Sequence, residues 1–138
     1  MIYLNKENTE KLIKDFPRLF RGINMSIREN LMSFGFMCGD GWFNLIYNLC
    51  KNIQIELNKD KNLEEDVYAV EVKEKFGGLR FYITCGNDRV FDLIQKAEEE
   101  SNKTCEVCGS NGSLSVSGRR YQTLCEKHRK ESGGKIVE

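Results

Sequence analysis

The feature that most constrains this chain is a set of four metal-ligand side chains near its C-terminus. Cys105 and Cys108 form a Cys-x2-Cys pair, Cys125 and His128 form a Cys-x2-His pair, and sixteen residues separate the pairs. Three thiolates and one imidazole make a complete tetrahedral set for zinc, which leaves no position for a catalytic water. The spacing therefore predicts one structural zinc ion, with ordinary buried thiols or two disulfides as the alternative.

The residues around these ligands have the pattern of a small zinc module. Gly109 permits a tight turn after the first pair, residues 114–116 and 119–124 can form a short hairpin, and the second pair falls at a predicted helix start. This order is typical of a zinc-ribbon or treble-clef module. We therefore predict two parts, an α+β domain over residues 1–102 and a zinc-binding module over residues 103–138.

Apolar residues at helical spacing predict three helices before the module. The first covers residues 9–16 with Thr9 as its N-cap, the second follows the Gly39-Asp40-Gly41 turn, and the third is capped by Asp88. The predicted buried face of the second helix consists of Trp42, Leu45, Ile46, Leu49, Cys50 and Ile53, and that of the third consists of Val90, Phe91, Leu93, Ile94 and Ala97. Residues 58–66 are predicted to be a charged loop. Whether the first helix packs on the domain or on a partner stays open.

Residues 67–75 and 79–85 predict two strands joined by a Gly77-Gly78 turn. In this register Lys75 faces Arg80 and Lys73 faces Tyr82. The apolar face of the hairpin then consists of Val70, Val72, Phe76, Leu79, Phe81 and Ile83. The predicted fold class is α+β, with helices packed on the apolar face of this hairpin.

The opposite face of the hairpin is the main candidate binding surface. It gathers the cations Lys73, Lys75 and Arg80 around Tyr82. Arginine can grip a phosphate with two donors while an aromatic ring stacks on a base, so a nucleotide-like ligand fits this chemistry. The alternative is a solvated sheet face on which glutamates neutralise the lysines.

A second basic cluster lies in the predicted zinc module, at Arg119, Arg120 and Lys130. Such groups commonly contact nucleic-acid phosphates, so a nucleic-acid-binding module is the alternative function. The whole chain has 21 basic and 21 acidic residues, which does not indicate a uniformly basic nucleic-acid binder.

An enzyme is the third possibility. His128 is the only histidine in the sequence, and as a zinc ligand it is not available as a general base. Asp40 between two glycines is the best remaining catalytic candidate, and a turn that caps the following helix is its alternative explanation. The sequence therefore predicts a binding protein without catalytic activity. It contains no apolar run long enough for a membrane span and no secretory signal, so we expect a cytoplasmic location and no membrane partner.

Four segments carry a resemblance to a known group of proteins. They read GDGWFNLIYNLC, VKEKFGGLRFYI, AEEESNKTCEVCG and TLCEKH. Together they resemble a family of small uncharacterised proteins encoded by bacteriophages and prophages, and the match covers most of the chain after residue 38. Residues that match the family pattern are Asp40, Trp42, Lys73, Lys75, Gly77, Gly78, Arg80 and Tyr82. Among these, Asp40 and Trp42 join the hairpin residues as candidate ligand-binding positions.

The resemblance implies a phage setting rather than a particular chemistry. It suggests a phage accessory protein in the host cytoplasm whose partner is a nucleotide-like ligand or a host protein. By analogy with other small phage proteins, the role it implies is interference with a host defence.

Overall fold

The computed structural model describes residues 2–138 and has the predicted α+β architecture. Its helices are α1 (Lys6–Asp15), α2 (Phe43–Asn58), α3 (Lys61–Asp66), α4 (Asp88–Ser101) and α5 (Glu126–Ser132). Its strands are β1 (Phe36–Met37), β2 (Ala69–Lys75), β3 (Gly78–Ile83), β4 (Ser113–Ser117), β5 (Arg120–Leu124) and β6 (Lys135–Ile136). Short 3₁₀ turns at Arg21–Asn24, Met32–Phe34 and Asp40–Trp42 connect them.

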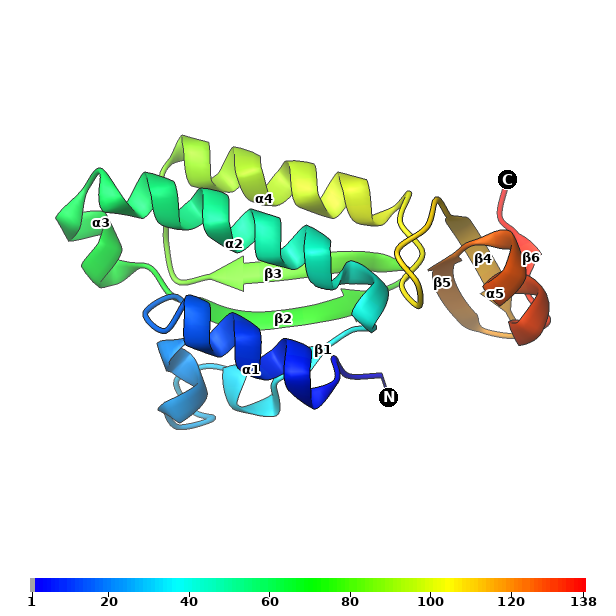
Figure 1. The fold of residues 1–138 in the computed structure, drawn as a ribbon, viewed down its shortest axis with the longest axis horizontal. Coiled ribbons are helices and arrows are strands. Elements are labelled where there is room, and N and C mark those ends of the chain that lie inside the picture. The colour runs from blue at the N-terminus through cyan, green and yellow to red at the C-terminus, as the bar shows by residue number, and fades with distance from the viewer. Residues whose placement is uncertain (1) are drawn as a thin grey trace.

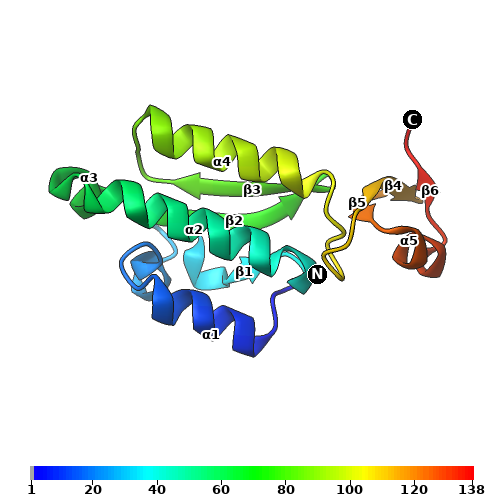
Figure 2. The same ribbon diagram turned by 45° about the horizontal axis from the view of Figure 1, so that its top comes forward.

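The first sheet has the order β1-β2-β3, in which β1 is parallel to β2 and β2 is antiparallel to β3. Helices α2 and α4 lie side by side along one side of this sheet (Figure 1). The second sheet has the order β5-β4-β6 and lies with α5 at one end of the molecule, as Figures 1 and 2 both show. The predicted zinc module is therefore a distinct layer placed beside the end of the first hairpin.

Helix α2 shows the predicted amphipathic pattern. Leu45, Ile46, Leu49, Cys50 and Ile53 are all buried in the core beneath it. Trp42 is also fully buried, but it belongs to the 3₁₀ turn that precedes the helix. Burial of a large apolar side chain is worth about 1.5–3 kcal/mol, so this stripe fixes α2 to the sheet.

Residues before β1 belong to the same core, which answers the question that the sequence left open. Leu12, Leu19 and Phe20 are buried against it. The backbone of this segment also pairs with β2, because Ala69 N donates to Leu19 O at 2.7 Å and Leu31 N donates to Val70 O at 2.8 Å. The first helix therefore packs on its own domain.

Three helix boundaries differ from the predictions because other side chains supply the caps. Helix α1 begins at residue 6 rather than after Thr9, since Asn5 Oδ1 accepts from Asn8 N at 2.7 Å. Asn87, not Asp88, caps α4. The predicted loop over residues 58–66 contains α3, because the Asp60 carboxylate accepts from two backbone N–H groups and starts a helix there. In α4, Phe91 lies outside the core and is exposed.

The hairpin forms, but its turn lies one residue earlier than predicted. The two central turn residues are Phe76 and Gly77, both with positive φ, and Lys75 pairs with Gly78. Lys73 consequently faces Arg80, and Glu71 faces Tyr82. The predicted apolar face keeps Val72, Leu79 and Phe81, whereas Phe76 leaves it and becomes 71 % exposed. An irregularity between residues 69 and 71 also places Ala69, rather than Val70, in the core.

Candidate metal centre and binding surfaces

Two local structures position the four candidate metal ligands. The first is a tight turn at the start of the C-terminal module, in which Gly109 N donates to Cys105 O at 2.9 Å and Gly109 has a φ of 82°. The second is the start of α5, where Cys125 is the N-cap and Arg129 N donates to Cys125 O at 2.9 Å. His128 lies in the first turn of that helix, so its ring points to the same side as the Cys125 thiol.

The structure brings all four ligand atoms within 4.8 Å of one another. Cys108 Sγ lies 3.8 Å from Cys125 Sγ, and His128 Nδ1 lies 3.1 Å from Cys125 Sγ and 3.6 Å from Cys105 Sγ. Zinc bonds of about 2.3 Å to sulfur and about 2.0 Å to nitrogen, arranged as a tetrahedron, would set these separations near 3.8 and 3.5 Å. The four side chains therefore have the geometry to hold one metal ion.

The environments of two of these thiols differ. Hydrogen bonds from the Ser110 side chain and backbone lower the pKa of Cys108 to about 6, which favours the thiolate that binds metals. Burial raises the pKa of Cys105 above its usual value. In this protein Cys108 is also the exposed member of the set, whereas Cys105 is fully buried.

The metal-ligand turn is attached to the α+β domain through Glu106, the residue after Cys105. Glu106 is only 1 % exposed, and burial raises the pKa of its carboxyl group. Its Oε2 accepts from Gly39 N at 2.9 Å, its Oε1 accepts from Gln122 Nε2 at 3.2 Å, and its backbone oxygen accepts from Gly41 N at 2.8 Å. The two glycines are required here because a Cβ at either would collide with the backbone at residues 105 and 106.

Asp40 and Trp42 both make structural contacts close to this junction. The Trp42 indole N–H donates to Thr104 O at 2.8 Å, and the ring is fully buried. Asp40 Oδ1 accepts from Asn5 N at 2.9 Å and from Asn8 Nδ2 at 3.0 Å, so Asp40 ties down the start of α1. Asp40 does not cap α2, because that helix has no side-chain cap. Both residues therefore have structural contacts that lie apart from the predicted hairpin surface.

The other predicted ligand residues do share one face of the first hairpin. Lys73 and Arg80 lie opposite each other, and Tyr82 is 42 % exposed. Lys73 forms an ion pair with Glu71 at 3.4 Å, which neutralises part of its charge. The guanidinium of Arg80 folds back to donate to Leu79 O at 3.1 Å, and together with the Asn102 side-chain oxygen it fills the space beside Gly78.

Sequence reasoning missed Phe76 as part of this surface. Phe76 has a φ of 54° and is the only residue other than glycine with positive φ among residues 2–138. Lys75 Nζ lies 5.7 Å from the centre of its ring. The sequence did not point to Phe76 in the turn, because Gly77-Gly78 is the pair that a two-residue turn favours.

Of the predicted nucleic-acid cluster, the structure brings one member close to the hairpin. Arg120 and Lys73 line the same cavity of about 500 Å³ between the two sheets, together with Ile2, Met37, Glu71, Glu74 and Glu106. Arg119 is exposed at the β4–β5 turn, and Lys130 on α5 is paired with Glu126 at 2.8 Å. Three carboxylates beside two cations make this cavity a poor site for a polyanion.

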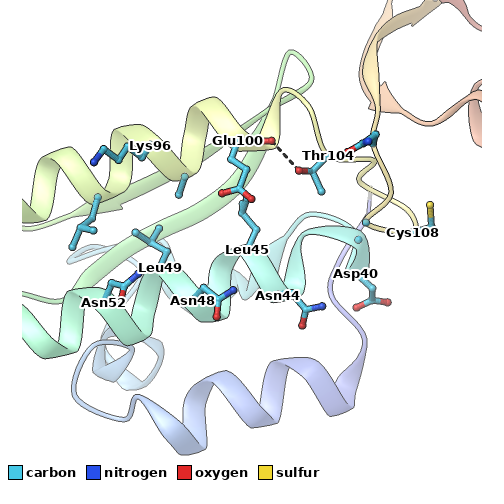
Figure 3. Close-up of a pocket in the computed structure, with 15 residues that line it drawn as sticks. Asp40, Asn44, Leu45, Asn48, Leu49, Asn52, Lys96, Glu100, Thr104 and Cys108 are labelled. Carbon is cyan, nitrogen blue, oxygen red and sulfur yellow. Dashed lines mark hydrogen bonds between the residues drawn. The ribbon is translucent and has the colours of Figure 1, made fainter.

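A further groove that the sequence analysis did not identify runs between α2 and α4. It has a volume of about 470 Å³ and ends at the metal-ligand turn. Asn44, Asn48 and Asn52 form one wall along α2, and Lys96 and Glu100 belong to the α4 side (Figure 3). The repeat of asparagine every four residues was the available signal.

Within residues 2–138, none of the helices is both long and apolar enough to cross a membrane. Comparisons with protein-family models, with curated proteins and with solved structures found no match to this chain. The functional proposal therefore rests on the chemistry of the surfaces described above.

Proposed function

We propose that this chain is a zinc-stabilised binding protein without catalytic activity, which engages a phosphate-bearing, nucleotide-like ligand through the face of the first hairpin. The observation that carries the proposal is Phe76, an exposed aromatic residue held in a left-handed conformation beside Lys75. The resemblance to phage proteins supports a role as a phage accessory protein that sequesters a host signal.

The left-handed backbone conformation of Phe76 lowers the stability of the fold. Two-residue hairpin turns of this kind favour Asn, Asp or Gly because both central residues need positive φ. An ordinary side chain in the left-handed region costs on the order of 1 kcal/mol. The ring is 71 % exposed and so recovers little of this cost by burial. Stacking against a ligand base gives Phe76 a purpose that the folded chain alone does not.

The neighbouring cations supply the phosphate contacts. Lys75 is exposed at the end of β2, and Arg80 is half-buried on β3 with its guanidinium at the Leu79 carbonyl oxygen. A guanidinium offers two parallel donors to a phosphate. Lys73 is secondary, because its ion pair with Glu71 must be broken before it can bind an anion. Tyr82 provides a second ring on the same face.

Zinc is the metal that best fits the Cys105, Cys108, Cys125 and His128 set, because softer thiolate ligands in a closed tetrahedron favour it. Its proposed role is structural. It holds the turn at Cys105 against the start of α5, and Glu106 then connects that turn to the domain.

Native mass spectrometry of the protein purified directly from cells is the first test. We expect one zinc ion and a retained mass of nucleotide size, and the retained species should be absent from the Arg80→Glu variant. Arg119→Glu is the matched control, since Arg119 is an exposed basic residue of the other sheet's turn and, unlike Arg120, does not line the cavity that contains Lys73. Loss of the ligand in Arg119→Glu but not in Arg80→Glu would instead assign binding to the zinc module. Retention in both variants, or no retained ligand, would contradict the proposal.

The Phe76→Asn variant tests the role of the ring. Asn tolerates the left-handed conformation, so we expect the free energy of unfolding to rise by roughly 0.5–1 kcal/mol. We also expect ligand affinity to fall about tenfold, because loss of a base–aromatic stack costs roughly 1–3 kcal/mol. Urea unfolding and fluorescence anisotropy with a labelled single-stranded oligonucleotide measure the two effects. A stabilised variant with unchanged affinity would remove Phe76 from the site.

A further inference from the structure

The groove between α2 and α4 has a polar wall and an apolar floor. Its floor is made by Leu45, Leu49 and Ala97, which are buried in the domain core. Its wall on α2 is a row of three asparagines that all point to the same side, as Figure 3 shows. Ala97 has a small side chain, so another chain can approach the floor closely at that point.

The asparagine row is unusual for an exposed helix surface. Asn is a weak helix former, because its side chain competes for backbone hydrogen bonds, and exposed helix positions more often carry Ala, Lys or Glu. Asn44, Asn48 and Asn52 are all exposed. Within the described part of the chain their amides make no hydrogen bond to another residue, so donors and acceptors of all three remain available to a ligand.

The spacing of the row matches an extended polypeptide. Residues four apart on a helix are separated by about 6 Å along its axis. Residues two apart in an extended chain are separated by about 6.6 Å. A carboxamide can donate to a backbone C=O and accept from a backbone N–H at the same time. Successive asparagines can therefore each hold every second residue of an extended segment, while the residues between point to the apolar floor.

The charged side chains differ between the two ends of the groove, and this difference favours one orientation of a bound segment. Asp40 and Glu100 lie toward the end formed by the metal-ligand turn, and Lys96 lies farther along α4 (Figure 3). A segment with a basic residue at one end and an acidic residue farther along complements this order. Asn44 to Asn52 spans about 12 Å, which corresponds to roughly four extended residues.

We infer that the α2–α4 groove binds an extended segment of a partner protein, held through its backbone by the three asparagines. This site is separate from the hairpin face, since none of the residues that line the groove belongs to β2 or β3. The inference does not depend on the proposed ligand of the hairpin.

The test is selection of a displayed random octapeptide library against the intact zinc-loaded protein. We expect enriched peptides to repeat apolar residues at every second position, with a basic residue at one end. Enrichment of apolar residues spaced three and four apart would indicate a helical ligand and would overturn the inference, as would no enrichment.

Variants of α2 then locate the binding. An enriched peptide, followed by fluorescence anisotropy, should bind Asn48→Ala about thirtyfold more weakly, because two hydrogen bonds of about 1 kcal/mol each are lost and every 1.4 kcal/mol is tenfold in affinity. Lys51→Ala, an exposed position on the same helix outside the groove, is the matched control and should bind as the wild type does. Unchanged affinity in Asn48→Ala would reject the asparagine row as the site.

Two further readouts separate backbone recognition from other causes. N-methylation of alternate peptide residues should abolish binding in one register only, since only every second N–H faces the row. Arg80→Glu should leave peptide affinity unchanged, so failure of the hairpin proposal and failure of this one can be told apart. Loss of binding in Arg80→Glu would contradict a separate peptide site.

Discussion

At the scale of single residues, the junction between the two sheets depends on the absence of two side chains. Gly39 and Gly41 let the backbone of Cys105 and Glu106 approach the start of α2 so closely that a Cβ atom would collide with it. The approach allows Glu106 to accept hydrogen bonds from both glycine N–H groups while buried. A buried carboxylate is tolerated only with such partners. Burial of the Glu106 side chain therefore depends on the close approach of the backbone at the two glycines.

Gly41→Ala should therefore destabilise the protein strongly. The obstructing atom is the Cys105 carbonyl oxygen, which cannot move without displacing a candidate metal ligand. We expect a loss of roughly 2–4 kcal/mol in the free energy of unfolding, as for overpacked buried sites. Urea unfolding of the zinc-loaded protein measures it. Gly118→Ala is the control, because Gly118 has open space around it and only the cost of its positive φ, about 1 kcal/mol. Equal losses in the two variants would mean that the backbone shifts enough to relieve the collision at position 41.

At the scale of elements, α4 protects the edge of the first sheet. The outer strand β3 has no strand partner on one side, and exposed edges invite pairing with other chains. Side chains of α4 occupy that edge instead. Leu79 N donates to Ser101 Oγ at 2.9 Å, and Phe81 N donates to Glu98 Oε2 at 3.0 Å. The helix thus supplies acceptors where a neighbouring strand would otherwise supply carbonyl groups.

Ser101→Ala should reveal this function of α4. The substitution leaves the buried Leu79 N–H without an acceptor, which costs roughly 1–3 kcal/mol. Thermal unfolding should show the loss. Glu98→Gln keeps an oxygen that can accept from Phe81 N and should change stability by less than about 0.5 kcal/mol. If Ser101→Ala is as stable as the wild type, water or a shifted side chain replaces the lost acceptor.

At the scale of the whole molecule, the two sheets are joined by contacts from several parts of the chain. Besides Glu106, Thr123 Oγ1 of β5 donates to Gly77 O in the first hairpin turn at 2.7 Å, and Trp42 donates to Thr104 O. A Cβ at Gly77 would collide with the Leu114 side chain, so the hairpin turn packs directly on the second sheet. A metal ion held by Cys105, Cys108, Cys125 and His128 would therefore stabilise a unit on which the larger domain also depends.

Removal of the metal should consequently destabilise the structure on both sides of the junction. Structural zinc contributes on the order of 10 kcal/mol to the folding of small modules. We expect a chelator to unfold residues 103–138 and to increase hydrogen exchange at Gly39 and Gly41, whose N–H groups donate to Glu106. Exchange in the middle of α2 should stay slow because its contacts lie within the domain core. Fast exchange confined to the C-terminal module would show that the junction survives without metal.

The features that were predictable from the sequence depend on short-range patterns. Each metal-ligand pair and the apolar stripe of α2 are patterns that lie within a short continuous segment of the chain. The hairpin turn was misplaced because Gly77-Gly78 is the better local choice, whereas the observed turn uses Phe76 and Gly77. Contacts of Asp40 with Asn5 and of Gly39 with Glu106 join distant residues, and one sequence contains no pattern that pairs them.

Gly39 and Glu106 are 67 positions apart, and this separation has a consequence for biosynthesis. As the chain leaves the ribosome, the segment before α2 emerges long before the carboxylate and carbonyl that complete its hydrogen bonds. The turn at residues 39–41 can be finished only after Glu106 has been made and brought against it. A segment that is made early in synthesis is thus completed late.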